Sequence, residues 1–249
     1  MYQYLNQKIF NILISRKIFV KKNKKKLFSV RKFAGATANR AHSFYTKEPE
    51  TVDWIDKFVE GSNFLDIGAN IGIYSLYAAS KKINVISLEP ESLNFFLLNL
   101  NIKDNGFDKY IKAYPISAGE NIEINNLNLS SFKFGGAGHS FGNTIGSDMR
   151  EFNSIYAQGS ISYDLDTLIN ALKFKPNYIK IDVDGNEHFV IKGMKNLLND
   201  KNLFSILVEI GKDNSNHLEV LDIIKSNGFS LVLKAGNNNN PTNNFIFSR

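Results

Sequence analysis

The sequence predicts an α/β domain built on a mostly parallel β-sheet, and three observations carry that prediction. From Asn63 onward, short apolar β-branched runs alternate with stretches of helical periodicity, which is typical of a parallel sheet covered by helices on both faces. The chain has 249 residues, of which 43% are hydrophobic, enough for one domain with a large core. The last two apolar runs have no helix between them, so they are expected to form an antiparallel hairpin.

Each expected element follows from its local pattern. Five parallel strands are expected where apolar runs occur, at 64–67, 84–89, 110–116, 178–183 and 205–210. The hairpin strands are expected at 229–234 and 244–249. Apolar residues recur at helical spacing over 51–59, 74–78, 91–106 and 217–228, and the last two stretches end in Asn-Gly, a helix stop signal.

Residues 117–163 interrupt this alternation with a segment rich in glycine and serine, including His139. So long an insertion in a compact domain is expected to be either a lid over the site or a mobile connection. Acceptor specificity is expected to reside there.

Charge divides the chain unevenly. Residues 1–47 hold 12 of the 30 Lys and Arg residues and none of the 24 Asp and Glu residues. We therefore expect a basic N-terminal arm over 1–47 and a catalytic domain over 48–249. Since the domain is net acidic, nucleic acid is not expected as a partner.

The basic arm allows two interpretations. Leu5, Ile9, Ile12 and Leu13 fall at helical spacing, and "KKNKKK" follows at 21–26. A basic amphipathic segment over 1–32 would lie on an anionic membrane surface. Alternatively, the arm packs its Leu and Phe residues on the domain. Neither a signal peptide nor a transmembrane helix is indicated, so we expect a cytoplasmic protein, either free or peripheral on the inner face of the membrane.

The stretch "FLDIGANIGIYS" (64–75) places a ligand loop after the first strand, where open parallel sheets bind ligands. Gly68 and Gly72 form G-x-x-x-G, and Asn70 stands where a dinucleotide loop would have glycine. Asp66 would repel a pyrophosphate and attract a donor with an ammonium and a sulfonium group. The sequence has no cysteine, which excludes disulfides, thiolate metal sites and a thiol nucleophile.

Glu89 ends the second strand, 21 positions after Gly68. That position suits a carboxylate accepting hydrogen bonds from two vicinal ribose hydroxyls. Ser117, after the third strand, is expected to join this nucleoside site.

A third cluster lies in "YIKIDVDGNEHFVIKGM" (178–194). Asp182 ends the fourth strand, while Glu187 and His188 open the following helix. Lys180 shares a strand face with Asp182, so we expect a carboxylate partner for it. Glu209 ends the next strand and is expected to be a neighbour of Asp182.

Together, "FLDIGANIGIYS", "ISLEPES" and "YIKIDVDGNEHFVIKG" resemble the FkbM family of S-adenosylmethionine-dependent methyltransferases. The resemblance implies a Rossmann-like class I fold with a seven-stranded sheet and one antiparallel strand, and O-methylation, often of sugar hydroxyls. It also implies that Asp66, Gly68 and Gly72 line the methionine part of the cofactor and that Glu89 binds the ribose. Where the family often has Asp-x-Glu-Gly, this chain has Asp184 in the Glu position.

Methyl transfer to a hydroxyl requires an aligned acceptor and a general base. The candidates are Asp182, His188, Glu187 and His139, and the strand-end position favours Asp182. Each has a structural alternative: pairing with Lys180 for Asp182, and plain solvent exposure for the histidines. A divalent metal held by Asp182 and Glu209 is a less favoured alternative.

Two other functions compete with a methyltransferase acting on a sugar or small-molecule hydroxyl. One is a nicotinamide-dependent oxidoreductase, disfavoured by Asp66 and Asn70. The other is a non-catalytic Rossmann-like scaffold docked through its basic arm.

Overall fold

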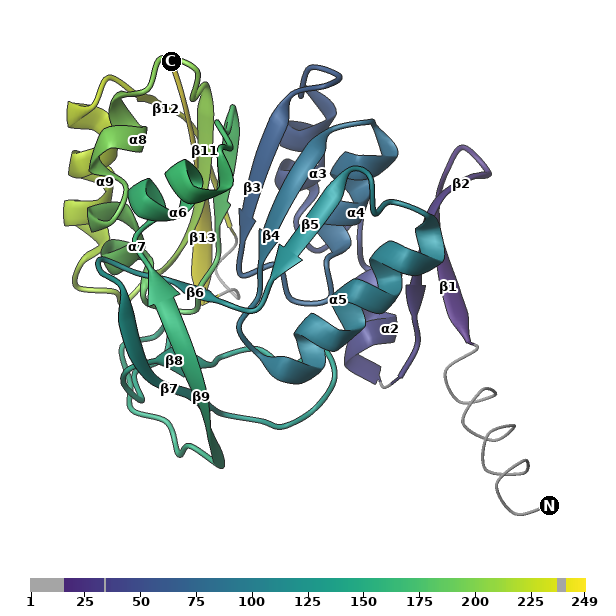
Figure 1. The fold of residues 1–249 in the computed structure, drawn as a ribbon, viewed down its shortest axis with the longest axis horizontal. Helices are drawn as coiled ribbons and strands as arrows, with labels where there is room; N and C mark the ends of the chain where they lie inside the picture. The colour runs from purple at the N-terminus through teal and green to yellow at the C-terminus, as the bar shows by residue number, and fades with distance from the viewer. Residues whose placement is uncertain (1–15, 34, 237–240) are drawn as a thin grey trace.

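The computed structural model describes residues 16–33, 35–236 and 241–249, and its centre is a seven-stranded sheet. The strand order is β12-β13-β11-β10-β3-β4-β5, and only β13 runs against its neighbours (Figure 1). The strands are β3 (Asn63–Ile67), β4 (Asn84–Leu88), β5 (Ile111–Tyr114), β10 (Tyr178–Ile181), β11 (Ser205–Gly211), β12 (Ser230–Ala235) and β13 (Thr242–Ser248). The predicted fold, a mostly parallel sheet ending in an antiparallel hairpin, is confirmed.

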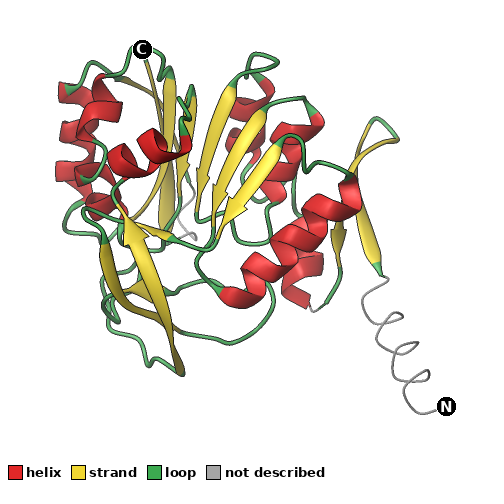
Figure 2. Ribbon diagram, in the orientation of Figure 1, coloured by secondary structure: helices red, strands yellow, loops and turns green. Residues whose placement is uncertain are grey.

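Helices cover both faces of this sheet (Figure 2). One apolar cluster joins the sheet to α3 (Pro49–Asp56), α4 (Ile73–Ser80) and α5 (Ser92–Asn105). A second cluster joins it to α6 (Leu165–Leu172), α7 (Glu187–Lys192), α8 (Lys195–Asn199) and α9 (His217–Ser226). The sequence pattern indicated the start of α7 at Glu187 but missed α6 and α8, and α8, with five residues, is too short to show several turns of periodicity. No helix among the described residues has the length and apolarity to cross a bilayer.

The described part of the basic segment forms an antiparallel hairpin and a helix packed on this core. The hairpin consists of β1 (Lys17–Lys22) and β2 (Lys25–Arg31), and α2 (Gly35–His42) follows. Asn23 and Lys24 both have positive φ, as a two-residue hairpin turn requires. "KKNKKK" is therefore the tip of a hairpin. The helical pattern of Leu5 to Leu13 lies outside the described residues.

Apolar residues on one face of the hairpin hold it against α4 and α5. Val20, Phe28 and Val30 are at most 3% exposed. The ring of Phe28 meets that of Phe44 edge to face at 5.5 Å. Arg31 forms an ion pair with Asp104 of α5. The lysines of the tip are exposed, so the hairpin has one packed face and one basic, solvated end.

The insertion folds as a second, four-stranded sheet instead of a strandless connection. It contains β6 (Ser117–Ala118), β7 (Glu123–Leu129), β8 (Ser140–Phe141) and β9 (Tyr156–Tyr163) in the order β6-β9-β7-β8. The sequence did not reveal β7 because "EINNLNL" has Asn where an apolar strand signal was sought. This sheet lies beyond the carboxyl ends of β3, β4 and β5 (Figure 1), so it faces the edge where ligands bind.

We expect the hairpin to contribute substantially to stability. Phe28→Ala should lower the free energy of unfolding by about 3–5 kcal/mol, because it removes a buried ring and leaves a cavity. Phe19 of the same hairpin is 44% exposed and is the matched control, for which Phe19→Ala should cost less than about 1 kcal/mol. Urea denaturation followed by the fluorescence of Trp54, the single tryptophan, measures both. Equal costs would show that the hairpin does not pack as described.

Candidate active site

The loop between β3 and α4 needs glycine at two positions for steric reasons. Gly68 has φ +77°, and a Cβ there would lie 1.8 Å from the carbonyl oxygen of Asp182. Gly72 has φ +84°, and a Cβ there would lie 2.3 Å from the side chain of Leu98. Any larger residue would push the loop away from β10 or α5. Gly68 lines the cavity described below, whereas Gly72 does not, so its role is to fit the loop against α5.

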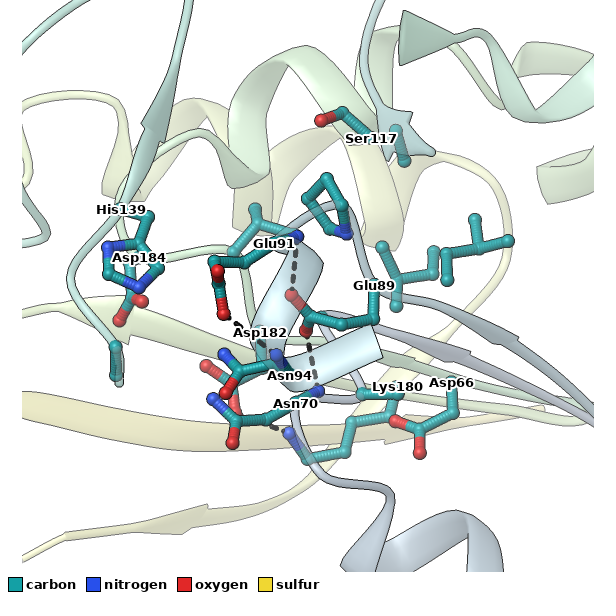
Figure 3. Close-up of a pocket in the computed structure, with 18 of the residues that line it drawn as sticks. Asp66, Asn70, Glu89, Glu91, Asn94, Ser117, His139, Lys180, Asp182 and Asp184 are labelled. Carbon is teal, nitrogen blue, oxygen red and sulfur yellow. Dashed lines mark hydrogen bonds and ion pairs between the residues drawn. The ribbon is translucent and has the colours of Figure 1, made fainter. Parts of the chain in front are cut away.

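Glu89 holds this loop to the start of α5. Its carboxylate accepts the backbone N–H of Asn70 at 2.6 Å and that of Glu91 at 2.9 Å (Figure 3). The side chain is 5% exposed, and burial raises the pKa of Glu89 to about 8, against the effect of these two backbone hydrogen bonds. Each carboxylate oxygen keeps a second lone pair. Glu89 can therefore still accept hydrogen bonds from a ligand.

A cavity opens around Glu89 at the carboxyl edge of the sheet. One wall is apolar and consists of Leu88, Pro90, Ile116, Ala118, Leu127 and Phe141. Ser117 also lines it, and the Ser117 hydroxyl has no hydrogen-bond partner among the described residues. A flat apolar wall next to a free hydroxyl and a carboxylate suits a nucleoside.

The other side of the cavity is built on a buried lysine. Lys180 is 1% exposed, and its Nζ lies 2.6 Å from Oδ2 of Asp182. Burial acts to lower the pKa of Lys180, but Asp182 and Glu48 are the strongest of several carboxylates that raise it above the ordinary value. Burial acts to raise the pKa of Asp182, but the charge of Lys180 outweighs this effect and holds the pKa below its ordinary value. Asp182 is therefore ionised at neutral pH.

Asp66 lines the cavity but is almost fully buried. It is 1% exposed, lies opposite Lys180 in the sheet register, and accepts a 2.5 Å hydrogen bond from the Ser75 hydroxyl. Burial raises its pKa, against the effect of Lys180. Asp66 thus ties β3 to the first turn of α4 and adds negative charge beside the loop.

His139 and Asp184 reach the cavity from two segments that meet there (Figure 3). The backbone N–H of Gly138 donates to Asp184 at 2.7 Å, and burial raises the pKa of Asp184 to about 6. Burial lowers the pKa of His139 to about 4, so its imidazole is neutral. Its Nδ1 accepts the backbone N–H of Ser130 at 3.3 Å. The ring proton is therefore on Nε2, which has no described partner.

Glu187 and His188 do not line the cavity. Glu187 is buried, its side chain folds back to accept the N–H of Gly185 at 3.0 Å, and burial raises its pKa to about 7. The ring of His188 lies against that of Phe189, with centroids 3.8 Å apart. Both residues were expected among the candidate bases, and the structure places them outside the cavity lining.

Glu209 lines the cavity and accepts a 2.5 Å hydrogen bond from Thr242. Burial and the charge of Asp182 raise the pKa of Glu209 to about 8, which agrees with the expected proximity of these two carboxylates. Among the described residues, no three His, Asp or Glu side chains are grouped so that they could hold a metal ion.

The sequence did not point to several residues that line the cavity. They are Arg40, Lys47, Tyr74, Glu91, Asn94 and Asn186. Glu91 caps α5 by accepting the N–H groups of Leu93 and Asn94, and a capping pattern was the available signal for it. Arg40 and Lys47 come from the basic segment, and no local pattern showed that this segment returns to the sheet edge.

Comparison with solved structures concerns the fold alone. Fibrillarin from Aeropyrum pernix, solved with natively bound S-adenosyl-L-methionine, superposes with a TM-score of 0.54 at 9% identity, covering 95% of this chain and 84% of that chain. A precorrin-6y C5,15-methyltransferase from Geobacter metallireducens GS-15 gives a TM-score of 0.49 at 10% identity, covering 82% of this chain and 89% of that chain. No curated protein matches the sequence.

The sequence profile of the methyltransferase FkbM domain matches residues 66–231. The match includes the loop after β3, Glu89, the insertion and the strand ends at Asp182 and Glu209. One domain type therefore matches two thirds of the chain, and the sheet described above has the Rossmann-like class I arrangement. The chain belongs to the FkbM family of methyltransferases.

Proposed function

We propose that this methyltransferase moves the methyl group of S-adenosylmethionine to a hydroxyl of a glycan, a lipid-linked sugar or a small metabolite. The observation that carries the proposal is Glu89, a buried carboxylate held between Asn70 and Glu91 at the mouth of an acid-lined cavity. In this arrangement Glu89 binds the ribose hydroxyls. The apolar wall and Ser117 bind the adenine ring.

The charge of the cavity favours a cationic donor over a dinucleotide. Its lining holds more acidic than basic side chains: Asp66, Glu89, Glu91, Asp182, Asp184 and Glu209 against Arg40, Lys47 and Lys180. Burial raises the pKa of Glu89 and of Glu209 to about 8. Negative charge on all the carboxylates of this cavity at once is therefore unfavourable. A sulfonium would offset the repulsion between these carboxylates, whereas a pyrophosphate would increase the negative charge.

We assign the role of general base to Asp182. The acceptor oxygen attacks the methyl carbon, the S–CH₃ bond breaks with its electron pair going to sulfur, and the acceptor proton passes to Asp182 and then to solvent. Asp182 is ionised, lines the cavity, and its side chain is 28% exposed. His139 is unsuitable as a base because its Nε2 already carries the proton, so it serves as a hydrogen-bond donor.

The basic hairpin supports an association with anionic membranes. Five of the six residues at its tip, 21–26, are lysines, and all six are exposed. Lys22 pairs with Asp56, so the remaining lysines are the ones that can face a lipid surface. A lipid-linked acceptor would bring its hydroxyl to the same surface.

Binding of S-adenosylhomocysteine tests the donor assignment. The unchanged protein should bind it in calorimetry and should not bind NADH or NADPH. Glu89→Ala should weaken S-adenosylhomocysteine binding by about 1–3 kcal/mol, because two hydrogen bonds to the ribose are lost. Glu60→Ala, at an exposed position of the surface, is the control. Binding of NADH alone would favour an oxidoreductase, and binding of neither would favour a non-catalytic scaffold.

Asp182 and Glu187 form a matched pair for testing the base. Asp182→Asn should lower turnover about 100-fold or more with an acceptor found by screening hydroxyl compounds, and should leave S-adenosylhomocysteine binding nearly unchanged. Glu187→Gln should leave turnover unchanged. Retained turnover in Asp182→Asn would contradict the assignment.

Glu187→Gln also carries a stability prediction. Burial raises the pKa of Glu187 from 4.5 to about 7, so the folded state holds a proton that the unfolded state releases between these pH values. The stabilising effect of the neutral acid is complete below pH 4.5 and is lost as the pH rises through 7. The substitution should therefore raise the free energy of unfolding at pH 8 by about 2–3 kcal/mol and change it little at pH 4.5.

Flotation with liposomes tests the membrane association. The full chain should float with vesicles containing phosphatidylserine and remain unbound with phosphatidylcholine alone. Replacing Lys24, Lys25 and Lys26 with Gln should weaken flotation about 100-fold, since each lysine near such a surface contributes about 1 kcal/mol. Unchanged flotation of this variant would show that the hairpin tip is not the contact.

A further inference from the structure

Arg40 is a cation of the cavity lining whose described hydrogen bond goes to a backbone carbonyl. It lies in the last turn of α2, is half-buried and lines the cavity. Its Nη2 donates to the carbonyl oxygen of Gly135 at 3.3 Å. It forms no ion pair with any Asp or Glu of the described residues, although the cavity lining is rich in both. Most of its five N–H donors are therefore available to a ligand.

The position of Arg40 differs from that of Lys47, the other cation that the basic segment brings to this cavity. Lys47 pairs with Glu48 at 2.6 Å and acts to lower the pKa of Asp182. Burial acts to raise the pKa of Glu89, Asp182 and Asp184, and the charge of Arg40 acts to lower the pKa of all three. The two cations thus differ in that Lys47 already has a carboxylate in ion-pair contact.

The backbone that Arg40 contacts is hydrogen-bonded to the residues around Glu89. Gly135, which accepts from Arg40, donates its N–H to Asn94 at 2.8 Å. The next residue, Gly136, accepts from Asn70 at 2.6 Å and from Asn94 at 3.1 Å. Asn70 in turn donates its N–H to Glu89. A short chain of hydrogen bonds therefore connects Arg40 to the group that binds the ribose in the proposed function.

We infer that Arg40 binds the α-carboxylate of the methyl donor and so positions its amino-acid part. This inference rests on the proposed function. The donor carries a sulfonium and an ammonium, which suit the acidic lining, and one carboxylate, which does not. A guanidinium presents two parallel N–H groups that match a carboxylate. Arg40 is the cation of the described lining that has both free donors and no acidic partner.

The test measures the binding of two ligands to variants at Arg40 and Lys47, in calorimetry on the full chain. The ligands are S-adenosylhomocysteine and its decarboxylated analogue, which lacks only the carboxyl group. Arg40→Gln should weaken S-adenosylhomocysteine binding about 10- to 100-fold, the loss expected for a charged hydrogen bond, and should change binding of the analogue less than about twofold. Arg40→Lys should recover part of the loss. Lys47→Gln tests the other cation of the basic segment and should weaken S-adenosylhomocysteine binding less than Arg40→Gln does, while Lys82→Gln, at an exposed position outside the cavity, is the control and should change neither affinity.

The outcomes separate this inference from the proposed function. If Arg40→Gln weakens both ligands equally, Arg40 acts through the fold and the inference is wrong. If it weakens neither, or if Lys47→Gln gives the larger effect, the carboxylate is bound elsewhere. If the unchanged protein binds neither ligand, the proposed function itself fails and the inference fails with it. Equal binding of both ligands by the unchanged protein would overturn the inference alone.

Discussion

A single buried ammonium group determines how the carboxyl edge of the sheet is arranged. Lys180 lies on β10 between Asp66 of β3 and Leu207 of β11, and it is 1% exposed. A charge in that position is tolerable only with carboxylates around it. They come from β3, from the end of β10, from β11 and from the residue before α3. Electrostatic pairing therefore fixes four segments relative to one another, and the cavity is shaped before any ligand binds.

The same arrangement explains why the loop after β3 resembles a phosphate cradle without being one. Its glycines allow a close turn, but the turn is used to approach the backbone of Asp182 and the side chain of Leu98. Asp66, with its hydrogen bond to Ser75, places negative charge beneath the loop. The geometry common to nucleotide-binding sheets is thus combined with a charge that suits a cation. Glu89 lies just after β4, the position from which an acidic residue binds ribose in dinucleotide sites.

The sequence predicted those parts of the fold and of the site that are marked by a pattern among neighbouring residues. The strands of the main sheet and the positions of Asp66, Glu89 and Asp182 followed from apolar runs and from the rule that ligands bind at strand ends. The hairpin at 17–31 was hidden because its turn, Asn23 and Lys24, lies within a run of lysines, and a lysine run indicates a solvated segment in most contexts. The small sheet was hidden by asparagines in β7. Arg40 and Lys47 could not have been placed, since only tertiary packing returns α2 to the sheet edge.

The segment from Gly135 to Gly138 links the small sheet to the main domain through hydrogen bonds. It is hydrogen-bonded to Asn70 and Asn94 on one side and to Asp184 on the other. The small sheet is also tied to the main domain through Gln158, which bonds to Ser92 and Pro90, and through Ser140, which accepts from Asn186. Elsewhere the insertion presents exposed side chains such as Ile124, Phe132 and Tyr156. Substitutions at these exposed positions would leave the hydrogen bonds of the Gly135–Gly138 segment intact, whereas substitutions within that segment would disturb the loop after β3.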